Sequence, residues 1–69
     1  MINPEIYGSG MKVWHNSKGE THRDNGPAVM WVGGSKFWYQ NSKLHREDGP
    51  AAEYSDGIKM WYINGTRIF

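Results

Sequence analysis

The chain has 69 residues, a net charge of +1 and no cysteine. This length predicts one domain with a small core, because a chain of about 60 residues buries only about 60% of its unfolded surface. The absence of thiols excludes disulfides and thiolate metal sites, and it favours a reducing, cytoplasmic setting. The first residues resemble no signal peptide, and no apolar run approaches the ~20 residues of a membrane-spanning helix.

The composition predicts an all-β fold. Four Trp, four Tyr, two Phe and nine Gly are typical of strands joined by tight turns, and apolar residues do not follow the period of a helix. We expect an antiparallel meander of β-hairpins in one small domain, residues 11–69, preceded by residues 1–10 as an N-terminal arm or an edge strand. The predicted strands are Met11–Asn16, Glu20–His22, Ala28–Val32, Lys36–Gln40, Lys43–His45, Ala51–Tyr54, Ile58–Ile63 and Thr66–Phe69.

Turn signals separate these strands in a regular order. Asn64-Gly65 is the strongest signal for a two-residue hairpin, and Asn41-Ser42 is its weaker equivalent one unit earlier. A second turn is predicted at Asp56-Gly57 and is matched by Gly33-Gly34. A third contains proline, at Asp48-Gly49-Pro50, and marks a strand entry or a kink because proline would interrupt a central ladder.

The chain repeats itself with a period of 23 residues. When residues 22–46 are aligned with residues 45–69, ten of the 25 pairs are identical. These pairs are His22/His45, Arg23/Arg46, Gly26/Gly49, Pro27/Pro50, Ala28/Ala51, Gly34/Gly57, Lys36/Lys59, Trp38/Trp61, Tyr39/Tyr62 and Asn41/Asn64. About two and a half units fit the chain, and the last one has Ile68 and Phe69 in place of its His-Arg step. Such an atypical end is expected of a terminal repeat.

A resemblance to the MORN repeat is carried by Tyr39-Gln40-Asn41-Ser42-Lys43-Leu44-His45, followed by Tyr62-Ile63-Asn64-Gly65 and the turn at Asp56-Gly57. It covers residues 13–69. Arg23 and Arg46 stand where that family usually has glycine, so the chain is similar to a divergent His-Arg-x-Asx-Gly-Pro-Ala variant of small phage-encoded proteins. The resemblance implies hairpins stacked into an elongated sheet, protein contacts and dimerisation.

Aromatic and arginine side chains are the candidate partner-binding residues. Alternation in Phe37-Trp38-Tyr39 places Trp38 on the face opposite to its neighbours, and a single-layer sheet cannot bury both faces. Exposed aromatic stripes mark a partner surface or a homodimer seam, and Trp, Tyr and Arg dominate binding hot spots. The candidates are Trp14, Arg23, Trp31, Trp38, Arg46, Tyr54 and Trp61.

The two arginines have two interpretations. Arg23 and Arg46 lie beside the Gly-Pro turns, where they would form an anion-binding rim or would pair with groups of their own turns. The near-neutral charge and the repetition favour the second interpretation.

Two repeated histidines stand near carboxylates. His22 and His45, with Asp24, Glu47 and Asp48, contain donor atoms for a metal ion. Their recurrence at one repeat position favours a packing role instead, and a third ligand is not evident. We therefore expect no metal and no cofactor.

No catalytic motif stands out, so the sequence predicts a non-catalytic protein-binding module rather than an enzyme. The resemblance to phage-encoded proteins implies that the partner is a host protein or complex in the host-cell cytoplasm, and that the protein inhibits a defence complex such as a CRISPR nuclease. A homodimer is also expected, because open sheet edges invite pairing. Two alternatives stay open: a nucleotide or single-stranded nucleic-acid binding protein, and a self-assembling structural component. Nucleic acid is the less favoured partner, and no membrane partner is expected.

Overall fold

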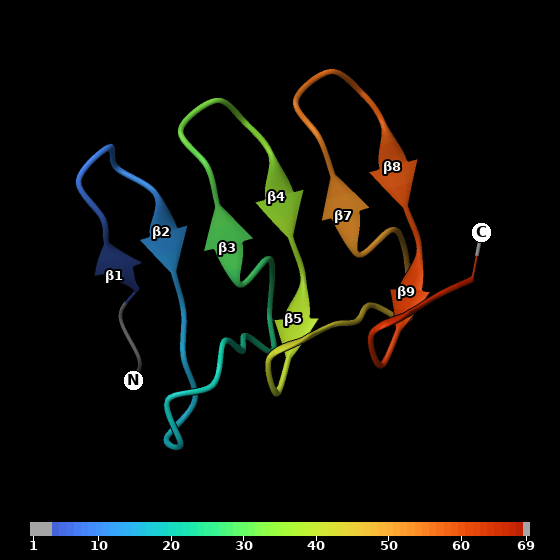
Figure 1. Cartoon of the computed structure of the whole chain (residues 1–69), viewed down its shortest axis with the longest axis horizontal. Coiled ribbons are helices and arrows are strands. Elements are labelled where there is room, and N and C mark those ends of the chain that lie inside the picture. Colours follow the sequence, from blue (N-terminus) through green and yellow to red (C-terminus); the bar gives the residue numbers. More distant parts are fainter. Residues whose placement is uncertain (1–3, 69) are drawn as a thin grey trace.

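Short antiparallel strands follow one another along residues 4–68, the part of the chain that the computed structural model describes (Figure 1). Six strands form one sheet in the order β1-β2-β3-β4-β7-β8. They are β1 (Glu5–Ile6), β2 (Lys12–Val13), β3 (Val29–Met30), β4 (Lys36–Phe37), β7 (Ala52–Glu53) and β8 (Lys59–Met60). Two further hairpins pair β5 (Tyr39–Gln40) with β6 (Lys43–Leu44), and β9 (Tyr62–Ile63) with β10 (Thr66–Arg67). The predicted all-β meander of antiparallel hairpins is confirmed.

Two of the longer predicted strands break in two at a repeat tryptophan. Lys36–Gln40 divides into β4 and β5, and Ile58–Ile63 divides into β8 and β9. Trp38 donates its N–H to the carbonyl of Ala51, beside β7, at 2.7 Å, whereas its own carbonyl accepts the N–H of His45 at 2.9 Å. The residue therefore belongs to the six-stranded sheet through its N–H and to the next hairpin through its carbonyl. The chain changes sheet there, which explains why β5 and β9 lie below the main sheet in Figure 1.

The predicted strand Glu20–His22 is wrong, because only a single bridge between His15 and Thr21 is present. The side chain of Asn16 accepts the N–H of Lys18 at 2.9 Å and that of Glu20 at 3.0 Å. These side-chain bonds replace ladder bonds and make a turn. At the other end, the predicted strand Thr66–Phe69 stops at Arg67, and its last residue lies outside the described residues, as do residues 1–3 of the predicted arm.

Residues 5–10 continue the repeat pattern towards the N-terminus. The N–H of Gly10 donates to the carbonyl of Tyr7 at 2.7 Å, as the N–H of Gly34 donates to Trp31 at 3.0 Å. The predicted boundary between residues 10 and 11 therefore falls inside the β1–β2 hairpin. His22 comes eight positions after Trp14, whereas His45 comes seven after Trp38, so the first unit has one extra residue, at the turn of Lys18-Gly19. Tyr7 therefore lies 24 residues before Trp31, and the 23-residue comparison misses the match.

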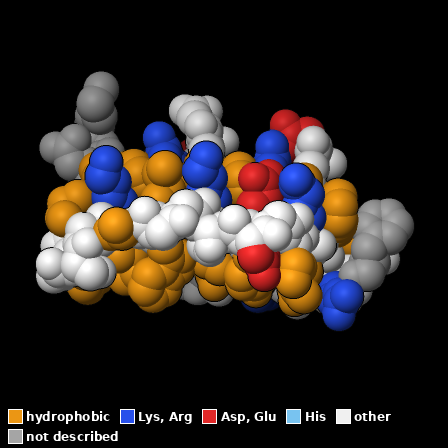
Figure 2. All heavy atoms as spheres, turned by 90° about the horizontal axis from the view of Figure 1, so that it is seen from above, with side chains coloured by type: hydrophobic (Ala, Val, Ile, Leu, Met, Phe, Trp, Pro, Cys, Tyr) orange, Lys and Arg blue, Asp and Glu red, His pale blue; other side chains and the backbone are white. Residues whose placement is uncertain are grey.

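Cross-strand pairing sorts the six-stranded sheet into two faces. One row is Glu5, Val13, Val29, Phe37, Ala52 and Met60, and the other is Ile6, Lys12, Met30, Lys36, Glu53 and Lys59. Residues paired across strands share a face, and neighbours along a strand alternate. Figure 2 shows Lys and Arg along one side of the molecule, while the opposite side is mainly apolar.

We name the two faces by these rows. The apolar face consists of Glu5, Tyr7, Val13, Val29, Trp31, Phe37, Ala52, Tyr54, Ile58 and Met60, where residues outside the paired row are placed by alternation. The lysine face consists of Ile6, Lys12, Met30, Lys36, Glu53 and Lys59, extended by Trp14 and Trp38.

The core is small and consists mainly of alanine. Among residues 4–68, the buried hydrophobic residues are Val13, Ala28, Ala51 and Ala52, and no large side chain is fully buried. The molecule extends 31 × 26 Å and is only 15 Å thick. Domains normally pack two layers around a core, but no second layer covers the apolar face in the described part of this chain.

The β3–β4 turn offers a test of the backbone geometry. Gly34 has a φ of +109°, which L side chains rarely adopt, whereas a Cβ on its neighbour Gly33 would meet no atom within 4 Å. We expect Gly34→Ala to lower the free energy of unfolding by about 1 kcal/mol or more. Gly33→Ala is the matched control and should change it little. Urea denaturation measures both, and equal effects would contradict the assigned turn.

Candidate functional site

Each arginine of the His-Arg step stacks on a tryptophan. The Cζ atom of Arg23 lies 3.9 Å from the centre of the Trp14 ring, and that of Arg46 lies 4.0 Å from the centre of the Trp38 ring. A cation over an indole face gains about 0.5–1 kcal/mol at exposed sites, and more when desolvated. Both rings are half-buried. The arginines thus cover rings that a single-layer sheet leaves open to water.

The Gly-Pro turn closes around the guanidinium group. The Nη1 atom of Arg23 donates to the carbonyl of Pro27 at 3.2 Å, and that of Arg46 donates to the carbonyl of Pro50 at 3.1 Å. A Cβ atom at Gly49 would lie 2.9 Å from the Cζ atom of Arg46. Glycine therefore leaves the space that the guanidinium group occupies, and proline supplies the acceptor. These contacts match the predicted pairing of each arginine with its own turn.

The second unit adds two carboxylates to this arrangement. Arg46 donates to Asp48 through Nε at 3.0 Å and to Glu53 through Nη1 at 3.2 Å. The first unit has Asn25 and Met30 at the corresponding positions. Arg46 is therefore held by a ring, a carbonyl and two carboxylates, and its charge is neutralised within the chain.

The repeated histidines connect each unit to the next hairpin. His22 accepts the backbone N–H of Asn41 at its Nδ1 atom at 3.1 Å, and His45 accepts that of Asn64 at 3.0 Å. Both asparagines have positive φ, at 52° and 49°, as two-residue hairpin turns require. The predicted packing role agrees with these contacts. Among residues 4–68, no three His, Cys, Asp or Glu side chains gather in a way that could hold a metal ion.

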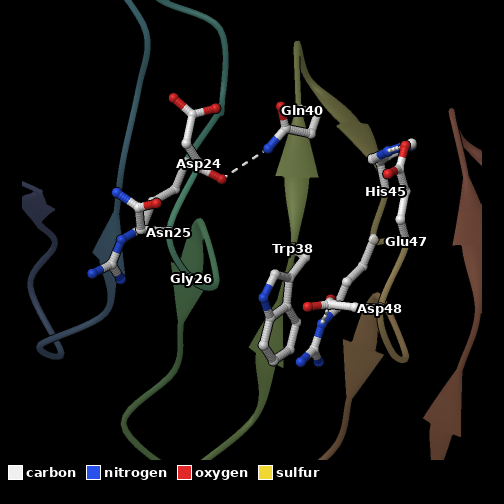
Figure 3. Close-up of a pocket in the computed structure, with 10 residues that line it drawn as sticks. Asp24, Asn25, Gly26, Trp38, Gln40, His45, Glu47 and Asp48 are labelled. Carbon is white, nitrogen blue, oxygen red and sulfur yellow. Dashed lines mark hydrogen bonds and ion pairs between the residues drawn. The ribbon is translucent and has the colours of Figure 1, made fainter.

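A shallow groove of about 710 Å³ lies between the two Gly-Pro turns (Figure 3). It is lined by Arg23, Asp24, Asn25, Gly26, Trp38, Gln40, His45, Arg46, Glu47 and Asp48. Trp38 lies between the loop of Asp24 and the loop of Asp48. The carboxylate of Asp24 is 2.9 Å from His22, and Asp48 is paired with Arg46. The charged groups of the groove are thus matched to one another and serve the fold.

The apolar face is open in contrast. Tyr7 is 46% exposed, Trp31 49%, Tyr54 39% and Ile58 52%. The Phe37 and Tyr54 rings pack edge to face, with centroids 5.4 Å apart and an interplanar angle of 83°. Neighbouring rings therefore hold one another in place while part of each stays accessible.

The seven predicted partner-binding residues do not form one surface. Trp31 and Tyr54 lie on the apolar face, whereas the two Arg–Trp stacks lie on the lysine face. Trp61 follows Met60 and is half-buried on the lysine side by alternation, and its carbonyl accepts the N–H of Ile68 at 3.0 Å. The sheet therefore separates the exposed aromatic residues from the two arginines, and a partner-binding role of these seven residues stays a prediction.

Sequence reasoning missed three residues of the apolar face, Tyr7, Phe37 and Ile58. Tyr7 was hidden by the one-residue shift in the repeat. Phe37 and Ile58 could have been found by alternation, since each lies two residues or one cross-strand pair from another member of the face.

No protein-family model, no curated protein and no solved structure matches the chain. Residues 4–68 contain no helix with the length and apolar character needed to cross a membrane. The fold and the site therefore define a small all-β protein of antiparallel hairpins, closed by Arg–Trp stacks on one side and open on the other.

The stack in the second unit can be tested by a change that keeps its charge. Arg46→Lys should lower the free energy of unfolding by about 1–2 kcal/mol, because an ammonium group loses the planar stack and part of the hydrogen bonding. The reverse exchange Lys59→Arg, at an exposed position of the same face, is the control. Chemical denaturation measures both variants. An Arg46→Lys variant as stable as the parent would contradict the role given to the stack.

The histidine contacts predict which ring nitrogen carries the proton. An Nδ1 atom that accepts an N–H must keep its lone pair, so neutral His22 and His45 should carry the proton on Nε2. His15 is the internal control, because its Nδ1 atom lies 3.1 Å from the Glu5 carboxylate and should carry a proton. Long-range ¹H–¹⁵N correlation spectra distinguish the tautomers. A proton on Nδ1 of neutral His22 or His45 would contradict the geometry.

Proposed function

We propose that this protein is a non-catalytic protein-binding module and that the apolar face is its contact surface. The observation that carries the proposal is the exposure of Tyr7, Trp31, Tyr54 and Ile58 on one ordered sheet face. Contiguous exposed apolar surface usually marks a protein contact. The Tyr54 ring, which packs against Phe37, also loses little conformational entropy on binding, which favours affinity.

The distribution of charge supports a protein partner over a nucleic acid. Single-stranded nucleic acids bind where bases stack on exposed rings beside cations that meet the phosphates. Lys12, Lys36 and Lys59 lie on the face opposite to the exposed rings. Arg23 and Arg46 are held by their own turns. Three of the lysines and both stacked arginines therefore lie away from the exposed rings.

The narrower proposal follows the resemblance to a divergent MORN-like repeat of phage proteins. Under it, the partner is a host protein in the host cytoplasm, and binding inhibits a defence complex such as a CRISPR nuclease. The 23-residue repeat and the recurrence of the same hydrogen bonds in successive units support the repeat assignment. The identity of the partner rests on the resemblance.

Affinity capture from a bacterial lysate, with and without nuclease, tests the binding proposal. We expect a protein at near-stoichiometric amount that survives nuclease treatment, because protein contacts do not depend on nucleic acid. The double variant Trp31→Ala/Tyr54→Ala should reduce its recovery by about tenfold or more, since aromatic anchors carry much of the binding energy.

The control variant is Ile6→Ala, an exposed apolar residue on the lysine face. It should leave capture unchanged. Recovery that is equal for all variants, or that consists of nucleic acid alone, would contradict the proposal.

A further inference from the structure

We propose that the protein partner of the apolar face is a second copy of this chain, packed face to face as a two-layer sandwich. This inference rests on the proposed function, because it names the occupant of the same surface, and at that surface it puts a second copy in place of the host protein of the narrower proposal. Four features of the structure support it: the poverty of the core, the size of the face, its lack of charge and the protection of the sheet edges.

The first feature is the small core of a single copy, which leaves apolar side chains of the sheet uncovered. The buried hydrophobic residues of the described chain are three alanines and Val13. Val29 and Phe37, in the middle of the apolar face, are only half-buried, as is Met60 in edge strand β8. A sheet is normally covered by a second layer, and the only protein sure to be present whenever this chain folds is another copy of it.

The second feature is the size of the face. The face runs across all six strands of the main sheet, along the long dimension of the molecule, which is 31 Å. Aligned sheets pack about 10 Å apart with interdigitating side chains. The face therefore presents side chains of six neighbouring strands to a second sheet.

The third feature is the absence of charge from the centre of the face. In the row that cross-strand pairing assigns to it, Glu5 is the only charged residue, and it lies in edge strand β1 beside His15. A two-fold interface brings the same patch of both copies together, so central charges would repel their own counterparts. An uncharged patch is self-complementary, whereas the lysine face would oppose Lys12, Lys36 and Lys59 to themselves.

The fourth feature directs association to the face rather than to the edges. The edge strands are β1 and β8, and each has two residues, like the other described strands. Pro4 comes directly before β1 and lacks an N–H, and Glu5 and Lys59 place charges in the two edge strands. Short strands, proline and charge are the usual means by which edges avoid pairing. In the proposed dimer, the lysine face of each copy, with its Arg–Trp stacks, would point outward.

Sedimentation equilibrium of the full chain, over micromolar to sub-millimolar concentrations, tests the proposal. We expect a monomer–dimer equilibrium that reaches twice the chain mass of 7.9 kDa. Ile58→Glu, alone and with Trp31→Glu, would bury a charge in the seam and should raise the dimer dissociation constant by about tenfold or more. Both positions are exposed in one copy, so folding of the variants can be checked by circular dichroism.

Ile6→Glu is the matched control, because it is the same substitution at a similarly exposed isoleucine on the lysine face. It should leave the dissociation constant unchanged. A monomer at every concentration, or a dimer that both glutamate series weaken equally or not at all, would overturn the inference. A monomer that still captures another protein through Trp31 and Tyr54 would leave the proposed function standing. A monomer that captures no protein would contradict both the dimer and the proposed function.

Discussion

The Arg46 guanidinium group, enclosed by the Trp38 ring, the Gly49 backbone and the Pro50 carbonyl, is the contact on which the repeat architecture depends. A sheet only one layer thick has no core to protect its aromatic side chains. A planar cation solves this problem locally, because it covers the ring with one surface and donates hydrogen bonds to the turn at its edge. The His-Arg-x-Asx-Gly-Pro-Ala sequence follows from these needs, since nearly every residue of it supports the stack or connects it to the next hairpin.

The Arg–Trp stacks cover aromatic rings on the lysine face only. On the lysine face, the Arg46 guanidinium group covers the Trp38 ring and pairs with Asp48 and Glu53 of the same chain. The opposite face receives no such cover in the described residues, and its rings and aliphatic side chains stay accessible. Under the proposed function, the arginine stacks maintain the fold and the opposite face meets the partner.

Much of the fold could be predicted from the sequence, because hairpin turns have strong local signals. Asn64-Gly65 has the backbone geometry that its sequence predicts, with φ values of 49° and 81°. The break at Trp38 could not be predicted, since alternation gives the face of a residue but not the sheet that receives its carbonyl. The position of Arg46 on the face opposite to Trp31 could not be predicted either, because it depends on which ring the guanidinium group covers. A single extra residue near Gly19 was enough to conceal the first hairpin of the repeat.

The central claim is that the apolar face is covered when the protein is in its functional, associated form. Its most direct test is the broadening of side-chain NMR signals by a soluble paramagnetic complex, which reports solvent contact residue by residue. At high protein concentration, the account predicts that Trp31, Tyr54 and Ile58 are protected while Ile6 and Lys36 are strongly broadened. Equal broadening of Ile58 and Ile6 would mean that the face remains bare, and it would contradict the account.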